Sequence, residues 1–437
     1  MDKKLFWALF TCLALCAPLA RAQYVPSEEN LQSRKEFSQR RLGIFLHWGI
    51  YSSYAQGEWY LSTHQLDTSA YKQAAGGFYP AQFDAAAWAD AFREAGAGYV
   101  TLTSRHHDGF SMYATRQTPF NIVDATPFGR DPLKELTEAV HARGMRMHYY
   151  YSLIDWIRPD YPKGSSGVAK DPSRANYNHY LAFEKAQLRE LLAYGPEAIW
   201  FDGKWDHDGE KDFPWQLESL YSLIHGIDPS CLVGNNHHSL PIDGEDFQMF
   251  ERDLPGENKS GYSGGQGVSE QVPLETCETM NSAWGYRVDD PHYKSVKQLV
   301  HLLVRAAAKG ANLLLNIGPQ ANGQLPAPAL ERLKGMGAWM AENGHTVNGC
   351  GATGIPPQAW GVSTGNGKTL YLHILESGNL VSDGQRAVIT VPFKGKPARV
   401  TLGAAKLPWT LSKDGFLSMT LPQPDPETID TIITIEL

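Results

Sequence analysis

The 437-residue chain contains only five cysteines, too few for a fold held together by disulfide bonds. Two of them, Cys12 and Cys16, fall in the apolar segment at the N-terminus, which leaves Cys231, Cys277 and Cys350 for the rest of the chain. An odd number cannot pair completely, so one bridge with a free thiol stays open as an alternative. Their spacing matches no metal-binding pattern.

A long apolar run is missing from the chain after its first 20 residues, so no second membrane-spanning candidate follows the first. Residues 1–22 read as a removable export signal, because two lysines precede an apolar core and Ala20-Arg21-Ala22 fits a small-x-small cleavage site. We therefore expect a mature chain beginning at Gln23. We expect it to be exported, as a periplasmic or secreted protein with no membrane anchor.

An excess of basic residues is also missing. Lysine and arginine number 39 against 47 aspartates and glutamates, a formal net charge of -8. This balance argues against a nucleic-acid partner, which needs a basic surface. Neither an internal repeat nor a low-complexity tract interrupts the chain, and its composition of 42% hydrophobic and 20% charged residues is that of a globular protein.

Short apolar runs alternate with longer amphipathic stretches between about Leu42 and Asn343, a pattern typical of parallel strands joined by helices. The pattern predicts an α/β domain over residues 23–348, a (β/α)8-like barrel of the TIM type. Short, glycine-rich gaps around strands five to seven predict that loops replace some helices there. The eight strands are expected to begin near Leu42, Gly98, Met145, Ala198, Cys231, Asp246, Pro273 and Ala311.

After Cys350 the hydrophobic period changes to two, which indicates strands with one buried face. Turns rich in Gly, Pro and Asp separate these segments. Residues 349–437 are therefore predicted to form a small C-terminal antiparallel β-sandwich. Its expected strands lie at residues 369–374, 387–391, 399–402, 416–421 and 429–437.

The segment Trp200-Phe201-Asp202-Gly203 carries the strongest indication of chemistry. A lone aspartate at a strand end more often caps the following turn or helix. The other predicted strand ends, however, also carry polar and aromatic side chains, and in a barrel all of these ends converge on one pocket. Asp202 is therefore our candidate for a catalytic carboxylate.

A pocket of carboxylates, histidines and tryptophans suits a sugar, since aromatic faces pack on a pyranose and glycoside hydrolysis needs two carboxyl groups. His106 and His107 could instead bind a metal or simply bond to the barrel backbone. Adjacent strand residues point to opposite faces and no third ligand stands at a recognisable spacing, so we favour hydroxyl binding. For Trp48, Trp59 and Trp200 the alternative is core packing.

Four motifs in sequence resemble those of the α-L-fucosidases of glycoside hydrolase family 29. They are His47-Trp48-Gly49, Gly57-Glu58-Trp59-Tyr60, His106-His107-Asp108-Gly109-Phe110 and Trp200-Phe201-Asp202-Gly203. The resemblance extends from about residue 41 to residue 319, and a trailing sandwich is also expected.

This resemblance implies a retaining exo-glycosidase that releases terminal α-L-fucose from glycoconjugates or oligosaccharides and needs no metal or cofactor. The nucleophile falls on Asp202. Tyr151 is our choice for the tyrosine of the third strand, with Tyr149 and Tyr150 left open. The resemblance implies substrate binding by His47, Glu58, Trp59, His106, His107, Tyr151 and Trp200.

The acid/base position varies within the family. The best match is Glu251, at the end of the sixth predicted strand, and the alternatives are Glu275 and Glu278. The role calls for a raised pKa, so we expect the apolar residues just before Glu251 to surround it.

Two other functions are also compatible with the sequence. One is a barrel glycosidase acting on a different sugar, because two carboxylates in a barrel are generic. The other is a protein that binds fucose without cleaving it. The sequence determines neither the fucosyl linkage nor the oligomeric state.

Overall fold

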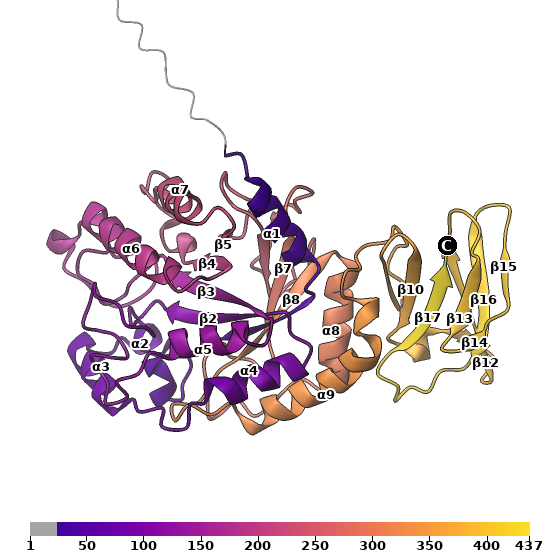
Figure 1. The fold of residues 1–437 in the computed structure, drawn as a ribbon, viewed down its shortest axis with the longest axis horizontal. Coiled ribbons are helices and arrows are strands. Elements are labelled where there is room, and N and C mark those ends of the chain that lie inside the picture. The colour runs from indigo at the N-terminus through magenta and orange to yellow at the C-terminus, as the bar shows by residue number, and fades with distance from the viewer. Residues whose placement is uncertain (1–23) are drawn as a thin grey trace, which may run out of the picture.

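The computed structural model describes residues 24–437, and the export signal expected at residues 1–22 lies outside the described residues. Eight parallel strands form a barrel, seen on the left of Figure 1. Each strand begins within two residues of the expected position. The strands are β1 (Leu42–Leu46), β2 (Tyr99–Arg105), β3 (Arg146–Ser152), β4 (Ala198–Asp202), β5 (Leu232–Asn236), β6 (Gln248–Glu251), β7 (Leu274–Thr279) and β8 (Ala311–Ile317).

The barrel is closed unevenly. Neighbouring strands pair in the order β5-β4-β3-β2-β1-β8-β7-β6, whereas β5 and β6 meet through a single bridge between Gly234 and Phe247. We call this junction of β5 and β6 the seam. Where these two strands begin, the Asp246 carboxylate accepts a hydrogen bond from the Val233 N–H at 2.7 Å. The Arg34 guanidinium donates a second hydrogen bond to this carboxylate at 2.6 Å. One buried side chain therefore replaces part of the missing backbone ladder.

Helices cover the outer face of the barrel as the alternating pattern predicted. The Asp84 side chain accepts from the Ala87 N–H at 3.0 Å and so begins α4, which buries Trp88 and Phe92. Among the described residues no helix lies between β5 and β6 or between β6 and β7, as the short gaps indicated. The helices are α1 (Glu28–Ser38), α2 (Tyr60–Thr63), α3 (Thr68–Ala74), α4 (Ala85–Glu94), α5 (Pro132–His141), α6 (Tyr177–Leu192), α7 (Leu217–Ile227), α8 (Val296–Ala308) and α9 (Ala327–Asn343).

Helix α1 packs against the end of the barrel at which the strands begin. Its Phe37 ring packs against Tyr99 at 5.3 Å and against Phe247 at 5.0 Å, both within the same buried cluster inside the barrel. Aromatic burial of this kind contributes about 2 to 3 kcal/mol per side chain. The interior is thus packed at the amino-terminal ends of the strands, and space is left at their carboxyl ends.

The C-terminal region is an antiparallel β-sandwich, on the right of Figure 1 beside α8 and α9. Inward side chains of both sheets, including Leu372, Ile389, Leu417 and Ile433, form one core. The first sheet contains β9 (Gly361–Gly365), β10 (Thr369–Ile374), β13 (Arg399–Leu402), β14 (Ala405–Lys406) and β17 (Thr431–Glu436). The second contains β11 (Val381–Ser382), β12 (Arg386–Pro392), β15 (Trp409–Leu411) and β16 (Phe416–Pro422).

The sandwich meets the barrel through buried polar contacts. Within the sandwich, His373 lies 2.7 Å from an Asp430 oxygen and 2.9 Å from the Thr364 hydroxyl, which in turn donates to the Thr346 carbonyl after α9 at 2.6 Å. Cys231, Cys277 and Cys350 are buried and free, so none of them forms a bridge. Within residues 24–437 no helix combines the length and the apolarity that crossing a membrane requires.

Candidate active site

A cavity of about 900 Å³ opens at the carboxyl ends of the barrel strands. This is the end at which β/α barrels carry their active sites, because the loops that follow the strands meet there. The convergence that the sequence predicted is therefore observed. The predicted site residues that line the cavity are His47, Glu58, Trp59, His106, His107, Trp200, Asp202 and Glu251.

Asp202 is the last residue of β4, and its carboxylate is held from several sides. Gly203 adopts a φ of +102°, which favours glycine, and its N–H donates to Asp202 Oδ1 at 2.8 Å. The Trp205 indole N–H also donates to Oδ1, at 3.1 Å. The Tyr150 hydroxyl donates to Oδ2 at 2.9 Å, and His107 Nε2 lies 3.5 Å from the same oxygen. The carboxylate is thus fixed in one orientation.

Glu251 is the last residue of β6 and lies across the seam from Asp202. The side-chain nitrogen of Asn236, the last residue of β5, donates to Glu251 Oε2 at 2.9 Å and to Asp202 Oδ1 at 3.3 Å. The distance between Glu251 Oε2 and Asp202 Oδ1 therefore cannot exceed the sum of these two distances. Such closeness is compatible with retaining glycosidases, whose carboxyl groups lie about 5 to 5.5 Å apart.

The two carboxyl groups have opposite pKa shifts. Burial raises the pKa of Asp202 to about 6, and the negative charge of Glu251 adds to the rise. Burial also acts to raise the pKa of Glu251, but hydrogen bonds from His238 and Asn236 outweigh it and hold that pKa below its ordinary value. The expectation of an apolar surrounding for Glu251 is wrong, because the apolar residues before it, Phe247, Met249 and Phe250, are packed in core clusters and do not line the cavity.

The polar wall of the cavity carries buried histidines. The His47 Nδ1 atom lies 2.7 Å from Asn316 Oδ1, and burial lowers the pKa of His47 to about 4. His106 Nδ1 is buried without a hydrogen-bond partner, and burial lowers the pKa of His106 well below its ordinary value. Neutral imidazoles can both donate to and accept from hydroxyl groups.

His106 and His107 enter the cavity together, with ring centroids 4.2 Å apart. The rule that neighbours point to opposite faces does not apply to them, because β2 ends at Arg105 and both residues lie in the following turn. Within residues 24–437 no group of three or more His, Cys, Asp or Glu side chains is placed to hold a metal ion.

Glu58 is a further carboxylate of the cavity wall. Its Oε2 atom accepts from the Gly285 N–H at 2.7 Å, and burial raises the pKa of Glu58. This hydrogen bond fixes one oxygen of Glu58 to the loop after β7. The segment Gly57-Glu58-Trp59-Tyr60 and that loop therefore form one continuous wall of the cavity.

Aromatic rings form the apolar surfaces of the cavity. Trp59 and Trp205 stack with centroids 5.6 Å apart, and Phe45 contacts Trp200 at 5.2 Å and Trp284 at 6.1 Å. The carbon faces of Phe45, Trp200 and Trp284 make an apolar corner at the base of the cavity.

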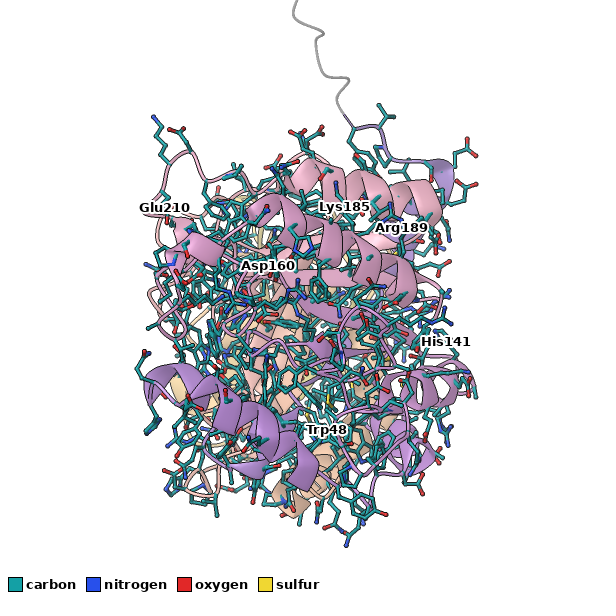
Figure 2. All side chains as sticks on the ribbon, turned by 90° about the vertical axis from the view of Figure 1, so that its left-hand side faces the viewer. Trp48, His141, Asp160, Lys185, Arg189 and Glu210 are labelled. Atoms are coloured by element: carbon teal, nitrogen blue, oxygen red, sulfur yellow. The ribbon has the colours of Figure 1, made fainter. Side chains whose placement is uncertain are left out.

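Trp48, labelled in Figure 2, lies outside the cavity. It packs against Phe83 at 5.2 Å and Trp88 at 5.1 Å, which matches the core-packing alternative for this residue.

The choice of Tyr151 is wrong: the tyrosine of β3 that lines the cavity is Tyr150. Successive strand residues point to opposite faces, so Tyr150 faces the barrel interior and Tyr151 faces the helices. The Tyr151 hydroxyl donates to Gln187 Oε1 at 2.9 Å, and its ring lies 4.9 Å from the Arg105 guanidinium.

Of the three acid/base alternatives, only Glu251 lines the cavity. Glu275 is fully buried below it, where its oxygens accept from the Trp200 indole N–H at 2.8 Å and from the Tyr99 hydroxyl at 2.6 Å. Glu278 accepts from the Thr279 N–H at 2.7 Å and lies 3.5 Å from Lys294. Glu275 and Glu278 therefore make structural contacts within the barrel and its loops and do not face the cavity.

Several lining residues were not among the predicted site residues. They come from strand ends and from loops whose course a hydrophobic pattern does not determine. Proximity to Asp202 in sequence was the one signal that could have found Trp205. These residues include Trp205, Asn236, His238, Tyr262 and Trp284, whereas Tyr150 had been left open beside Tyr151.

Known proteins share this sequence and architecture. The family model described as α-L-fucosidase matches residues 11–345. Among curated relatives, the plasma α-L-fucosidase of Rattus norvegicus is 30% identical, over 95% of this chain and 94% of the relative.

The solved structures of similar proteins extend the match to nearly the whole chain. The α-L-fucosidase isoenzyme 1 of Paenibacillus thiaminolyticus has a TM-score of 0.81 at 31% identity, covering 94% of this chain and 99% of that chain. A family 29 α-L-fucosidase of Bacteroides thetaiotaomicron, trapped as a covalent intermediate, has a TM-score of 0.79 at 25% identity, covering 93% and 96%. With its paired carboxylates in a barrel cavity, the chain belongs to the α-L-fucosidases of glycoside hydrolase family 29.

Proposed function

We propose that Asp202 is the nucleophile and Glu251 the acid/base of this retaining enzyme, which hydrolyses terminal α-L-fucosyl residues. The observation that carries the assignment is the Asn236 amide nitrogen, which contacts both carboxylates at 3.3 and 2.9 Å and so keeps them at a short separation across the seam. A retaining mechanism requires this short separation because one carboxylate must attack the sugar directly.

In the first step, an Asp202 oxygen forms a bond to the anomeric carbon while the bond to the leaving oxygen breaks. Glu251 gives its proton to that oxygen, so the departing group leaves as a neutral alcohol. The hydrogen bonds from Gly203, Trp205 and Tyr150 orient the attacking carboxylate before the substrate arrives, which lowers the entropic cost of attack.

In the second step, the Glu251 carboxylate takes a proton from water, and the water oxygen attacks the anomeric carbon. The bond to Asp202 breaks and fucose leaves with its original configuration. The pKa of about 6 for Asp202 means that its carboxylate form, which attacks, predominates at higher pH.

The walls of the cavity support a 6-deoxy sugar as the substrate. His47, His106 and Glu58 offer donors and acceptors to ring hydroxyls, while the corner of Phe45, Trp200 and Trp284 is apolar. The indole N–H of Trp200 is already bound to Glu275, so the ring presents carbon to the sugar. This corner suits the methyl group of fucose and disfavours the hydroxymethyl group of a hexose, which would lose its hydrogen bonds to water.

The enzyme acts on fucosylated glycans from their non-reducing ends, because packed aromatic side chains close the base of the cavity. We further propose that it works outside the cytoplasm, since residues 1–22 have the pattern of an export signal. Secretion assays of the full chain, compared with a chain that lacks these residues, test this placement.

Replacement of Asp202 tests the nucleophile assignment. The Asp202→Gly variant is expected to lose turnover by about 10³-fold or more, and added azide should then trap a fucosyl azide of inverted configuration in the vacated space. Asp212→Gly, an exposed aspartate on the following loop, is the matched control. Full activity in Asp202→Gly, or no azide product, contradicts the assignment.

The leaving group tests Glu251. Glu251→Ala should slow release from natural fucosides by about 10²-fold or more, and much less from aryl fucosides whose leaving groups need no proton. Glu278→Ala is the matched control, because Glu278 lies outside the cavity. Equal losses on both substrates would reject Glu251 as the acid. Fucose binding without any release, in the wild-type protein, would instead favour a non-catalytic binding protein.

A further inference from the structure

His238 lies beside Glu251 and is held there by an unusual backbone. Its φ is +56°, and Arg252, the residue after Glu251, has a φ of +58°. A non-glycine residue in this left-handed region costs about 1 to 2 kcal/mol, and such strain gathers at functional sites. The two strained residues lie on opposite sides of the seam and both line the cavity.

The His238 side chain is positioned by two contacts. Its Nε2 atom lies 3.4 Å from Glu251 Oε2, and its ring stacks on Tyr262 with centroids 5.6 Å apart at an angle of 13°. The same Glu251 oxygen accepts the bond from Asn236. The imidazole therefore reaches the carboxylate that the proposed mechanism uses as acid, and it does not reach the nucleophile.

Charged groups around His238 favour its protonated form. Asp202 comes from β4, Asp208 from the loop after β4 and Glu251 from β6, and all three are negative when ionised. Burial acts to lower the pKa of His238, but the hydrogen bond and charge of Glu251, with the two aspartates, outweigh it and raise the pKa. Of the positive charges nearby, Arg252 lowers the pKa of Glu251, and Lys204 lies 3.6 Å from Asp208.

We propose that His238 is a positioning residue that shares one proton with Glu251, so that the pair, and not the Glu251 carboxyl alone, stores the proton given to the leaving group. This inference rests on the proposed role of Glu251. Before attack the proton moves from His238 Nε2 to Glu251, which leaves neutral imidazole and a carboxylic acid. Glu251 passes the proton to the leaving oxygen, and the proton taken from water in the second step restores the pair.

The pH dependence of kcat/KM separates this role from simple packing. In the wild type the alkaline limb of the pH profile reports loss of the shared proton, at a pH above the ordinary pKa of a histidine. In His238→Gln the side chain still donates a hydrogen bond but stores no proton, so the limb should fall toward a carboxyl value, by about one pH unit or more. Loss of the positive charge also raises the pKa of Asp202, which moves the acid limb upward. The bell-shaped pH profile of kcat/KM should therefore become narrower on both its acid and its alkaline side.

The experiment measures kcat/KM from pH 4 to 9 on a fucoside with a poor leaving group, for wild type, His238→Gln and His237→Gln. His237 is the adjacent histidine, but its Nε2 lies 2.9 Å from Glu245, so it is the matched control and should keep the wild-type limbs. His238→Phe, which retains stacking on Tyr262, should narrow the bell in the same way. Thermal unfolding of each variant establishes that it is folded.

A lower rate at every pH with unchanged limbs in both His238 variants would overturn the proposal. That result is distinguishable from failure of the Glu251 assignment, which Glu251→Ala reports independently through its leaving-group dependence. With an aryl fucoside that needs no proton, the alkaline limb of His238→Gln should return to that of the wild type. An alkaline limb that stays lowered on this substrate would also overturn the proposal.

Discussion

Glu275 should make the barrel less stable as the pH rises, and Glu275→Gln should remove that dependence. The carboxyl group is fully buried between the Tyr99 hydroxyl and the Trp200 indole, and burial raises its pKa from 4.5 to about 7. A glutamine fits the same place, because its oxygen can accept from Trp200 and its amide can donate to the Tyr99 oxygen.

The magnitude follows from the two pKa values. Because the folded value is higher than the unfolded one, the folded state holds the proton more tightly, and its advantage is complete below pH 4.5 and lost as the pH rises through 7. A difference of about 2.5 units is about 3 kcal/mol, most of which disappears between pH 4 and pH 8. Glutamine does not titrate, so the variant should lack this loss.

Urea denaturation followed by tryptophan fluorescence, at several pH values from 4 to 8, provides the test. The free energy of unfolding of the wild type minus that of Glu275→Gln should fall by about 3 kcal/mol across the range. Taking the difference cancels the contributions of other buried acids, such as Asp108, whose pKa burial raises to about 7. A difference that stays constant within about 0.5 kcal/mol would refute the reasoning.

The other predictions concern the site tyrosines and the seam. Tyr150→Phe should lower kcat by about 10- to 100-fold, because Asp202 loses a charge-assisted hydrogen bond. Tyr151→Phe should leave kcat within about twofold and cost about 1 kcal/mol of stability, and the opposite order would contradict the placement of the two rings. Arg34→Met should cost about 3 kcal/mol, because it removes a partner of buried Asp246, and should speed amide exchange in β5 and β6 first. Uniform exchange would contradict this role of the seam.

The sequence was sufficient to predict the architecture and eight residues of the cavity wall, among them both proposed catalytic carboxylates. The carboxyl ends of parallel barrel strands meet at one pocket, so Asp202 could be placed from the apolar run that ends at it, whereas the choice of Glu251 rested on the family resemblance. The shortest strands of the sandwich, such as β11 and β14, have too few residues to show a period.

What could not be predicted depends on side-chain direction. Tyr149, Tyr150 and Tyr151 are identical in type, and the register of β3 alone decides which of them faces the interior. Trp284 and Tyr262 lie on long loops, where no hydrophobic period exists to place them. The pKa of Glu251 depends on its contact with His238, which follows the neighbouring strand β5. This is a tertiary contact that no local sequence pattern indicates.

The seam also lies between two groups of site residues. The nucleophile and the histidine wall belong to the continuous part of the barrel, from β7 through β1 to β4, whereas the acid/base and its neighbours follow β5 and β6. Within residues 237–247 and 252–273, positions other than His238, Asp246, Phe247, Arg252 and Tyr262 can therefore be exchanged with little strain on the ladder that holds Asp202. Engineering directed at new aglycones should begin with these two loops, since the histidines and the apolar corner proposed to select fucose come from other parts of the cavity wall.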